Sequence, residues 1–323
     1  MTPKEYAKHF WDLQVYLLTP KAATYPAVIV NPAVTLYMAE KTYEGFMTGV
    51  AQALHSMFQE DHGIWYRTRV ASYRLGPSGE DKNEDGKVNW DKKDGKSDIL
   101  YQNNLNSAVN GKTKFKVFVR RLDGVFETKL IEQYKDISYA ATAPFSGKGF
   151  PEEVQICLQL RYRYQKSPLT MAQFTSGSAI GLDCNGFVGG FLRRRADLSG
   201  WYRTKDGFGP NTTITELMGK PAEWLKSLGD LKPPGTQSLI LGRCNASGNI
   251  IEHQGGEIGH IMITEPNTMK TEGGKTFFEV VESTGGLGLV ASEYRVEAMP
   301  KPGIFNVWRG SKKEYMTVRI RQV

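Results

Sequence analysis

The chain has few cysteines, no long apolar run and no strong excess of either charge. Three cysteines in 323 residues, an odd number, argue against a disulfide framework and predict at least one free thiol. The apolar runs, such as residues 27–30, are far shorter than the about 20 residues that a helix needs to cross a bilayer. The formal net charge of +7 comes from scattered residues, which a mildly basic solvated surface explains. We therefore expect neither a membrane span nor a nucleic-acid partner.

Two further signals are absent. No repeat with a period of about 20 to 50 residues is visible, which argues against a repeat architecture. Residues 1–9 contain no basic stretch followed by an apolar run and a small-residue cleavage site, so no secretory signal is legible. The sequence leaves the location of the protein unknown, with export by another route still open, and it does not indicate an oligomeric state.

What is present indicates a globular protein of two domains. With 40% apolar and 23% charged residues the chain can build a packed core, and its length corresponds to about two domains of roughly 150 residues. In the first part, apolar spacing predicts a helix over residues 42–59, and β-branched and aromatic residues predict strands over 64–73 and 114–120. A turn signal at 122–124 predicts a hairpin, and the polar residues 79–98 predict a surface loop.

A cluster of Ala, Ser, Gly and Pro at residues 141–151 separates this part from the rest. We place the domain junction there, which gives an α+β domain of unknown role at residues 1–145 and a second domain at 146–323. In the second domain the patterns predict helices first and an antiparallel sheet after them. The expected helices are 152–163, 184–195 and 213–228, and the expected strands are 258–264, 276–282, 287–296, 303–308 and 315–323.

The most informative string is residues 181–195, which read GLDCNGFVGGFLRRR. Its apolar residues recur at helical spacing and predict a helix whose first turn contains Cys184. A helix N-terminus favours the thiolate form of a cysteine, and its N–H groups can stabilise a developing oxyanion. Gly189 and Gly190 would each cost about 1 kcal/mol in a helix interior, which predicts that another element packs closely there. The alternative for Cys184 is a small buried structural residue, but the flanking string favours a nucleophile.

A nucleophilic cysteine needs a base, and one of the five histidines is well framed for that role. His260 follows the Gly-rich residues 255–259 and begins an apolar strand, on which His260 and Met262 are expected to face the same side. His253, seven residues earlier, lacks a following apolar strand. We therefore expect His260 to take the proton of the thiol.

The base in turn needs a group that orients its other ring nitrogen. The strand expected at residues 276–282 ends with Glu282, and an antiparallel neighbour of the histidine strand is where such a carboxylate reaches the imidazole. Glu279 and Ser283 remain alternatives for this role. The residues thus predict a Cys–His–carboxylate arrangement, with Glu282 as its third member.

Three of these segments resemble the ordered motifs of the NlpC-type cell-wall cysteine peptidases. They are residues 183–188 (DCNGFV), 259–263 (GHIMI) and 280–283 (VVES), and the latter two also resemble the related CHAP amidases. The likeness extends over about residues 152–296, where 231–241 resembles the turn and strand ahead of the histidine. It does not include the first part of the chain.

This resemblance implies a papain-like fold, with a cysteine-bearing helix packed on an antiparallel sheet. It implies hydrolysis of amide bonds in cell-wall (peptidoglycan) peptides, commonly beside a D-glutamyl residue, through a thioester intermediate and without a cofactor. Cys184 is then the nucleophile, His260 the base and Glu282 the orienting group. The residues expected to contact the peptide substrate are Asp183, Asn185 and Gly259.

Two other functions stay open. The chain has Asn185 where the family usually has Ser, and it lacks the family's upstream Tyr and Trp-Gly-Gly run. The long separation between Cys184 and His260 implies an insertion at about residues 200–228. One alternative is a binding or structural module that has the fold without the chemistry. The other is an amidase or acyl transferase of the same fold that acts on a different substrate.

A weak calcium-loop pattern lies in the first part of the chain. Asp81, Asn83, Asp85 and Asn89 stand at positions one, three, five and nine of an EF-hand-like loop. Lys92 occupies the position of the essential final carboxylate, so a solvated loop without metal is favoured. The cysteines and histidines have no close zinc-ligand spacing, and we expect no metal at the cysteine site.

Overall fold

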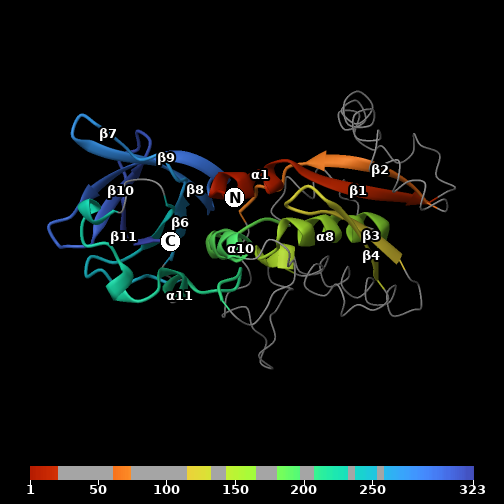
Figure 1. Cartoon of the computed structure of the whole chain (residues 1–323), viewed down its shortest axis with the longest axis horizontal. Coiled ribbons are helices and arrows are strands. Elements are labelled where there is room, and N and C mark those ends of the chain that lie inside the picture. The colour runs from red at the N-terminus through yellow and green to blue at the C-terminus, as the bar shows by residue number, and fades with distance from the viewer. Residues whose placement is uncertain are drawn as a thin grey trace. The chain divides into compact units, whose positions relative to one another are not determined.

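A computed structural model of the chain describes residues 1–20, 61–73, 115–131, 143–164, 180–196, 207–231, 237–252 and 258–323. The chain divides into two compact units, which are coloured along the sequence in Figure 1. The hairpin unit comprises His9–Gly181, and the barrel unit comprises Met1–Lys8 together with Leu182–Val323. The predicted helix at 42–59 and loop at 79–98 lie outside the described residues.

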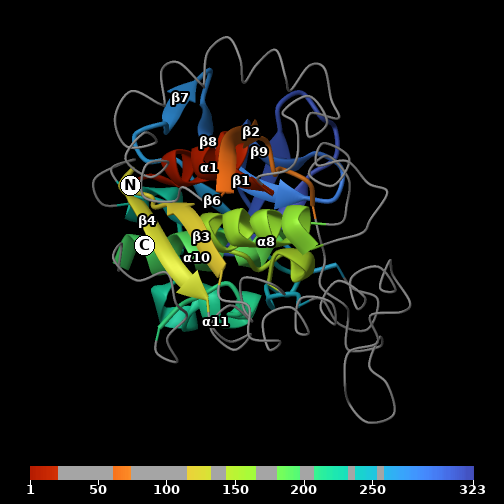
Figure 2. The same ribbon diagram turned by 90° about the vertical axis from the view of Figure 1, so that its right-hand side faces the viewer.

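The hairpin unit contains two antiparallel strand pairs and one long helix. Its described elements are the end of α1 (Pro3–Trp11), β1 (Leu13–Pro20), β2 (Asp61–Thr68), β3 (Phe115–Arg120), β4 (Phe126–Ile131), the 3-10 helix η6 (Ala143–Ser146) and α8 (Pro151–Tyr164). β1 pairs with β2 and β3 pairs with β4, and α8 packs against β1 and β3 (Figure 2). The turn between β3 and β4 has Gly124 at φ 84°, a left-handed conformation that favours glycine. The predicted hairpin and the predicted helix at 152–163 are confirmed.

Two glutamine side chains of α8 bind the backbone of β3. Gln159 Oε1 accepts from Phe118 N at 2.9 Å and its Nε2 donates to Phe118 O at 2.5 Å. Gln155, one helical turn earlier, does the same with Arg120, at 2.8 Å for both bonds. The two amides therefore satisfy backbone groups along a strand edge in the way that another strand would.

In the described residues of the barrel unit, α10 is followed by three short helical segments and seven strands. Its elements are α10 (Cys184–Ala196), α11 (Ile214–Met218), the 3-10 helices η7 (Pro221–Glu223) and η8 (Leu228–Asp230), β5 (Leu239–Arg243), β6 (Ile261–Thr264), β7 (Lys270–Glu272), β8 (Lys275–Thr284), β9 (Gly288–Ala298), β10 (Phe305–Arg309) and β11 (Met316–Gln322). The predicted helix at 184–195 and all five predicted strands are confirmed. β6 begins three residues later than the predicted strand at 258–264.

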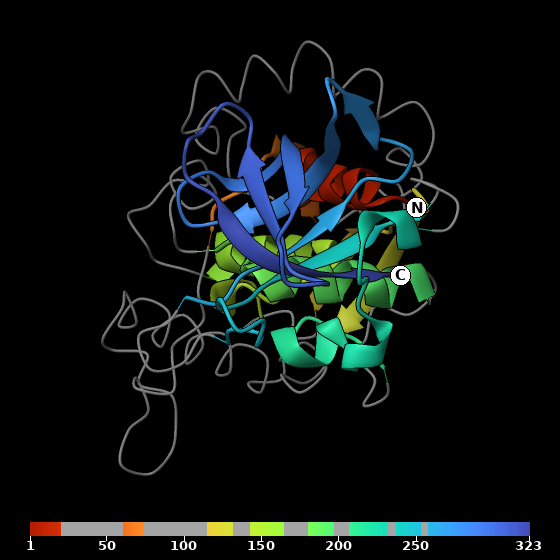
Figure 3. The same cartoon turned by 90° about the vertical axis from the view of Figure 1, so that its left-hand side faces the viewer.

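The strands of this unit close into a barrel. Their order is β6-β5-β11-β10-β9-β8-β7, every neighbouring pair is antiparallel, and β6 also pairs with β8. This last pairing joins the two ends of a six-stranded sheet, and β7 pairs with the first residues of β8 (Figure 3). Closure leaves the hydrogen-bonding edges of those six strands paired along much of their length.

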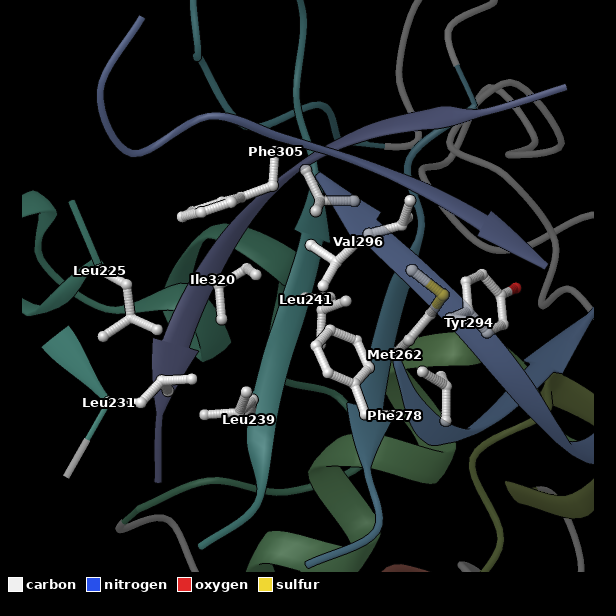
Figure 4. Packing of buried hydrophobic residues seen from close by; sticks show 13 residues of the cluster. Leu225, Leu231, Leu239, Leu241, Met262, Phe278, Tyr294, Val296, Phe305 and Ile320 are labelled. Atoms are coloured by element: carbon white, nitrogen blue, oxygen red, sulfur yellow. The ribbon is translucent and has the colours of Figure 1, made fainter. Parts of the chain in front are cut away.

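Alternating residues of the strands fill the barrel interior. On β8, Phe278 and Val280 point inward, and the next residue of the same parity is Glu282. Met262 of β6 belongs to the same interior cluster, as expected for its side of the strand. The cluster, drawn in Figure 4, consists of Leu225, Leu231, Leu239, Leu241, Met262, Phe278, Val280, Tyr294, Val296, Phe305, Val307, Val318 and Ile320.

The helix α10 packs on the outside of the barrel, against β6 and β8. Gly189 is required there, because a Cβ at this position would lie 2.0 Å from the carbonyl oxygen of Gly209. The predicted close approach of another element to this helix is therefore confirmed. The ring of Tyr6, in the first turns of α1, lies 5.6 Å from that of Phe187 and 6.1 Å from that of Phe191. Residues from the start of the chain thus complete the packing around α10.

The predicted helix at 213–228 is wrong in its length. Only Ile214–Met218 form an α-helix, with Thr213 and Glu216 as a capping box at its start. Gly219 ends it at φ 64°, and Pro221 then begins a 3-10 turn because proline cannot continue the ladder of backbone hydrogen bonds.

The domain junction at residue 145/146 stays a prediction, while the structure groups residues 146–181 with the hairpin unit. All three cysteines lie in the described part of the chain and none of them is in a disulfide, which confirms the expectation of at least one thiol outside a disulfide. Among the described residues no helix combines the length and apolar character needed to cross a membrane.

Candidate active site

Cys184 is the first residue of α10, and Asp183 caps the helix in front of it. The Asp183 carboxylate accepts from the backbone N–H of Gly186 at 2.5 Å, and its carbonyl accepts from Phe187 N at 3.1 Å. The N–H of Cys184 lies in the first turn, where no intrahelical acceptor exists. Cys184 is 5% exposed, and its thiol stands at the positive end of the helix dipole.

A hydrogen bond ties the start of α10 to the barrel. The Ser283 hydroxyl on β8 donates to the carbonyl of Leu182 at 2.7 Å, and both residues are fully buried. Ser283 faces outward, opposite in parity to Glu282 on the same strand. β8 therefore fixes Leu182, two residues before Cys184, with the side chain of Ser283 and supplies the carboxylate with the adjacent Glu282.

His260 stands immediately before β6 and is 8% exposed. Its carbonyl accepts from Arg243 N on the neighbouring β5 at 2.8 Å, which holds the backbone in register. The preceding position, 259, requires glycine because a Cβ there would lie 2.5 Å from the carbonyl oxygen of Ile251. The histidine is thus placed by tightly packed backbone on both sides.

The imidazole of His260 binds Glu282. Nε2 lies 2.7 Å from Glu282 Oε2; Glu282 lies on β8, and His260 lies directly before β6, the strand that pairs with β8. The Glu282 side chain is fully buried. An ionised carboxylate only accepts, so Nε2 carries the proton in this contact. The predicted reach of the carboxylate to the imidazole is confirmed, and its catalytic role stays a prediction.

The side chain of Cys184 lies close enough to the same imidazole to act on its pKa. Because Nε2 is taken by Glu282, Nδ1 is the ring nitrogen that remains for sulfur. Burial alone would lower the pKa of His260, but the hydrogen bonds and negative charges of Cys184 and Glu282 raise it to about 9. At neutral pH the raised pKa favours an imidazolium at His260, beside the ionised Glu282.

Glu282 has two further partners inside the barrel. Its Oε1 accepts from the Tyr294 hydroxyl at 2.5 Å and from the Arg309 guanidinium. Burial would raise the pKa of Glu282, but the hydrogen bond and charge of His260 and the charge of Arg309 lower it below its usual value. The carboxylate therefore stays ionised although water does not reach it. We call His260, Glu282, Tyr294 and Arg309 the polar end of the barrel.

Glu279 and Ser283, the two alternatives for the group that orients His260, both have other partners. Glu279 lies on the outer face of β8, where both its oxygens accept from Lys4 Nζ at 2.7 and 3.0 Å. Ser283 is engaged with Leu182, as described above. Glu282 is the member of this strand that reaches the imidazole.

The residues expected to contact substrate have structural partners. Asp183 caps α10, Gly259 relieves a backbone clash, and the Asn185 amide donates to Thr212 O at 2.9 Å. Their contact with a substrate stays a prediction. Cys157 is fully buried in α8, and burial raises the pKa of Cys244 to about 11.

The sequence did not point to Tyr294 and Arg309. The one signal for them in the sequence is their place two residues from an inward-facing valine. Tyr294 lies two residues before Val296 on β9, and Arg309 lies two residues after Val307 on β10. Recognising that these two residues belong to one site requires the strand register that places Arg309 opposite Tyr294. That register depends on the closed barrel and is not visible in either strand alone.

No group of three or more His, Cys, Asp or Glu side chains with metal-binding geometry occurs within the described ranges. The candidate calcium loop, with Asp81, Asn83, Asp85 and Asn89, lies outside these ranges, as does His253.

Comparisons with known proteins return no relative. No family model matches the chain, and no curated protein or solved structure does either.

Proposed function

We propose that this protein is a cysteine hydrolase that cleaves amide bonds in cell-wall (peptidoglycan) peptides, with Cys184, His260 and Glu282 as its triad. The observation that carries the proposal is the imidazole of His260, which binds the buried carboxylate of Glu282 through Nε2 and leaves Nδ1 to the Cys184 side chain beside it. A nucleophile, a base and a group that orients the base, in that order, are what acyl transfer through a thioester requires.

The reactive form is the ion pair that results when the thiol proton has moved to Nδ1 of His260, a thiolate beside an imidazolium. The sulfur attacks the scissile carbonyl carbon, and the oxyanion that forms is stabilised by backbone N–H at the start of α10, that of Cys184 included. Collapse of this intermediate breaks the C–N bond, and the imidazolium gives its proton to the leaving amine. The acyl group is then bound to sulfur as a thioester.

Hydrolysis of the thioester uses the same groups again. His260, now neutral at Nδ1, takes a proton from water, and the hydroxide attacks the acyl carbon. The tetrahedral intermediate expels the Cys184 thiolate and releases a carboxylic acid. Throughout, Glu282 holds Nε2, so that Nδ1 stays directed at the sulfur.

The peptide substrate class rests on the likeness of residues 183–188, 259–263 and 280–283 to the NlpC-type and CHAP enzymes. The same likeness, with the helix on an antiparallel sheet, supports a papain-like fold class for the barrel unit. A closed six-stranded sheet and a cysteine at the start of a packed helix are compatible with that class.

The test is digestion of purified peptidoglycan and its soluble peptide fragments, with the products read by mass spectrometry. We expect the wild-type chain to release fragments with new amine and carboxyl ends, and Cys184→Ala to release none. The matched control is Cys244→Ala, which removes a buried thiol that has no imidazole partner among the described residues and should leave cleavage intact. Full activity of Cys184→Ala contradicts the triad. A folded wild-type chain that cleaves no wall material contradicts the hydrolase assignment and favours a binding module.

A further inference from the structure

Glu282 carries its charge at one end of an otherwise apolar barrel. The side chain is fully buried, and its inward neighbours on β8 are Phe278 and Val280. A buried carboxylate is costly unless each oxygen is hydrogen-bonded and its charge is balanced. The two oxygens of Glu282 divide this task, because Oε2 binds His260 while Oε1 binds Tyr294 and Arg309.

The charges at this site balance only with Arg309. When the thiol proton has moved to the imidazole, Cys184 and Glu282 are negative and His260 is positive. Arg309, whose side chain is 18% exposed, supplies the second positive charge at Glu282 Oε1. Without it the buried group would have a net negative charge, and protonation of Glu282 would relieve the imbalance. A protonated Glu282 no longer stabilises the imidazolium.

Tyr294 and Arg309 also fix the direction of the carboxylate. Arg309 Nε donates to the Tyr294 hydroxyl oxygen at 2.8 Å, so the phenol proton points to Glu282 Oε1, where the O–O distance is 2.5 Å. The guanidinium carbon lies 5.6 Å from the centroid of the Tyr294 ring, and the two residues are opposite each other in the β9–β10 register. With Oε1 held from two strands, Oε2 is directed at His260.

We propose that Arg309 and Tyr294 are positioning residues for the cysteine site, holding Glu282 ionised and oriented so that His260 keeps Cys184 as a thiolate. This inference rests on the proposed function for the meaning of the thiolate, but it concerns the reactivity of Cys184 and needs no substrate for its test. The groups that face this network are Cys184 of α10, His260 before β6, Glu282 of β8, Tyr294 of β9 and Arg309 of β10.

The experiment measures the rate at which iodoacetamide alkylates Cys184 in the full chain between pH 5 and 10, with the modified residue identified by mass spectrometry. Removing a hydrogen bond to a charged group typically changes an equilibrium by about 10- to 100-fold. We expect Tyr294→Phe to slow alkylation at pH 6 by about 10-fold and Arg309→Met to slow it by more. Arg309→Lys should restore part of the rate.

The pH profile of Cys184 alkylation in Glu282→Gln serves as the reference for loss of the carboxylate charge. The pH profile of Arg309→Met should shift in the same direction. The matched control is Arg295→Met on β9, whose guanidinium lies 4.2 Å from the Trp308 ring centroid on the outer face. It should leave the profile unchanged. A purely structural role for Arg309 would lower the denaturation midpoint without shifting the profile.

The outcomes separate this inference from the proposed function. If Tyr294→Phe and Arg309→Lys both match the wild-type profile, the positioning role is wrong even where the wild type cleaves peptidoglycan. If both variants shift the profile while no wall material is cleaved, the positioning role stands and the substrate assignment fails. Where Arg309→Met does not fold, the isosteric Tyr294→Phe decides the matter, because it removes one hydroxyl and little packing.

Discussion

Along β8 the apolar interior of the barrel gives way to its polar end. Phe278 and Val280 meet other apolar side chains, whereas Glu282, the next inward residue, meets a histidine, a tyrosine and an arginine. The interior contacts are non-directional and scale with the apolar area that they remove from water. The polar contacts depend on particular atoms at particular distances, so the loss of any partner leaves a buried charge unbalanced. The inward face of β8 thus combines an apolar region, where one apolar side chain can replace another, with the polar end, where each side chain is required.

Glu282→Ala should have the largest effect on both stability and chemistry. Losing one partner of a buried ion pair typically costs about 3–5 kcal/mol of unfolding free energy, because the other charges stay buried without compensation. The loss of the orienting carboxylate should also lower the rate of amide cleavage by about 10²- to 10⁴-fold. Urea unfolding and peptidoglycan digestion measure the two effects. A variant that keeps wild-type cleavage would show that His260 needs no carboxylate.

Leu241→Ala tests the other half of the comparison. This side chain is fully buried in the interior cluster, and the truncation should cost about 2–5 kcal/mol through lost burial and a residual cavity. Because the polar end has its own contacts, the pH profile of Cys184 alkylation should stay that of the wild type in the folded protein. A shifted profile would mean that packing in the interior, and not the polar contacts alone, sets the charge at the cysteine site.

The pH dependence of the unfolding free energy should report the protonation of His260. The pKa of His260 is raised from 6.5 to about 9 on folding, so its protonation stabilises the folded state fully below about pH 6.5. This contribution is lost as the pH rises through about 9. Unfolding of the wild type and of His260→Gln, measured from pH 6 to 10, should give a difference that shrinks across this window. A constant difference would contradict a raised pKa in the folded state.

Ser283→Ala should have the smallest effect of the four. It removes the donor to the Leu182 carbonyl, and a buried carbonyl left without a partner costs about 1–3 kcal/mol. Because this bond anchors the residue before Asp183 and Cys184, we also expect a modest fall in cleavage rate with little change in the pH profile. Ser283→Thr, which keeps a hydroxyl, is the matched control.

The elements around the site were largely visible in the sequence, because they depend on local patterns. Helical spacing placed Cys184 in the first turn of α10, and period-two alternation placed His260 and Met262 on one side of β6. The short α11 was predicted too long, because the stop at Gly219 and Pro221 outweighs the apolar residues beyond it. The early elements α1 and β1 were not predicted. α1 is stabilised by contacts with residues far along the chain, since Tyr6 packs against Phe187 and Phe191.

The sequence by itself indicated Cys184, His260 and Glu282 as candidate site residues and the kind of element on which each one lies. A helix start, a strand start and an alternating strand are decided by neighbours a few residues away. Only the tertiary structure decided that these elements meet, and that Glu282 rather than Glu279 or Ser283 faces the imidazole. The same holds for Tyr294 and Arg309, which join the site through the closure and register of the barrel. A buried charge is stabilised by atoms brought together from distant parts of the chain, and no local pattern specifies them.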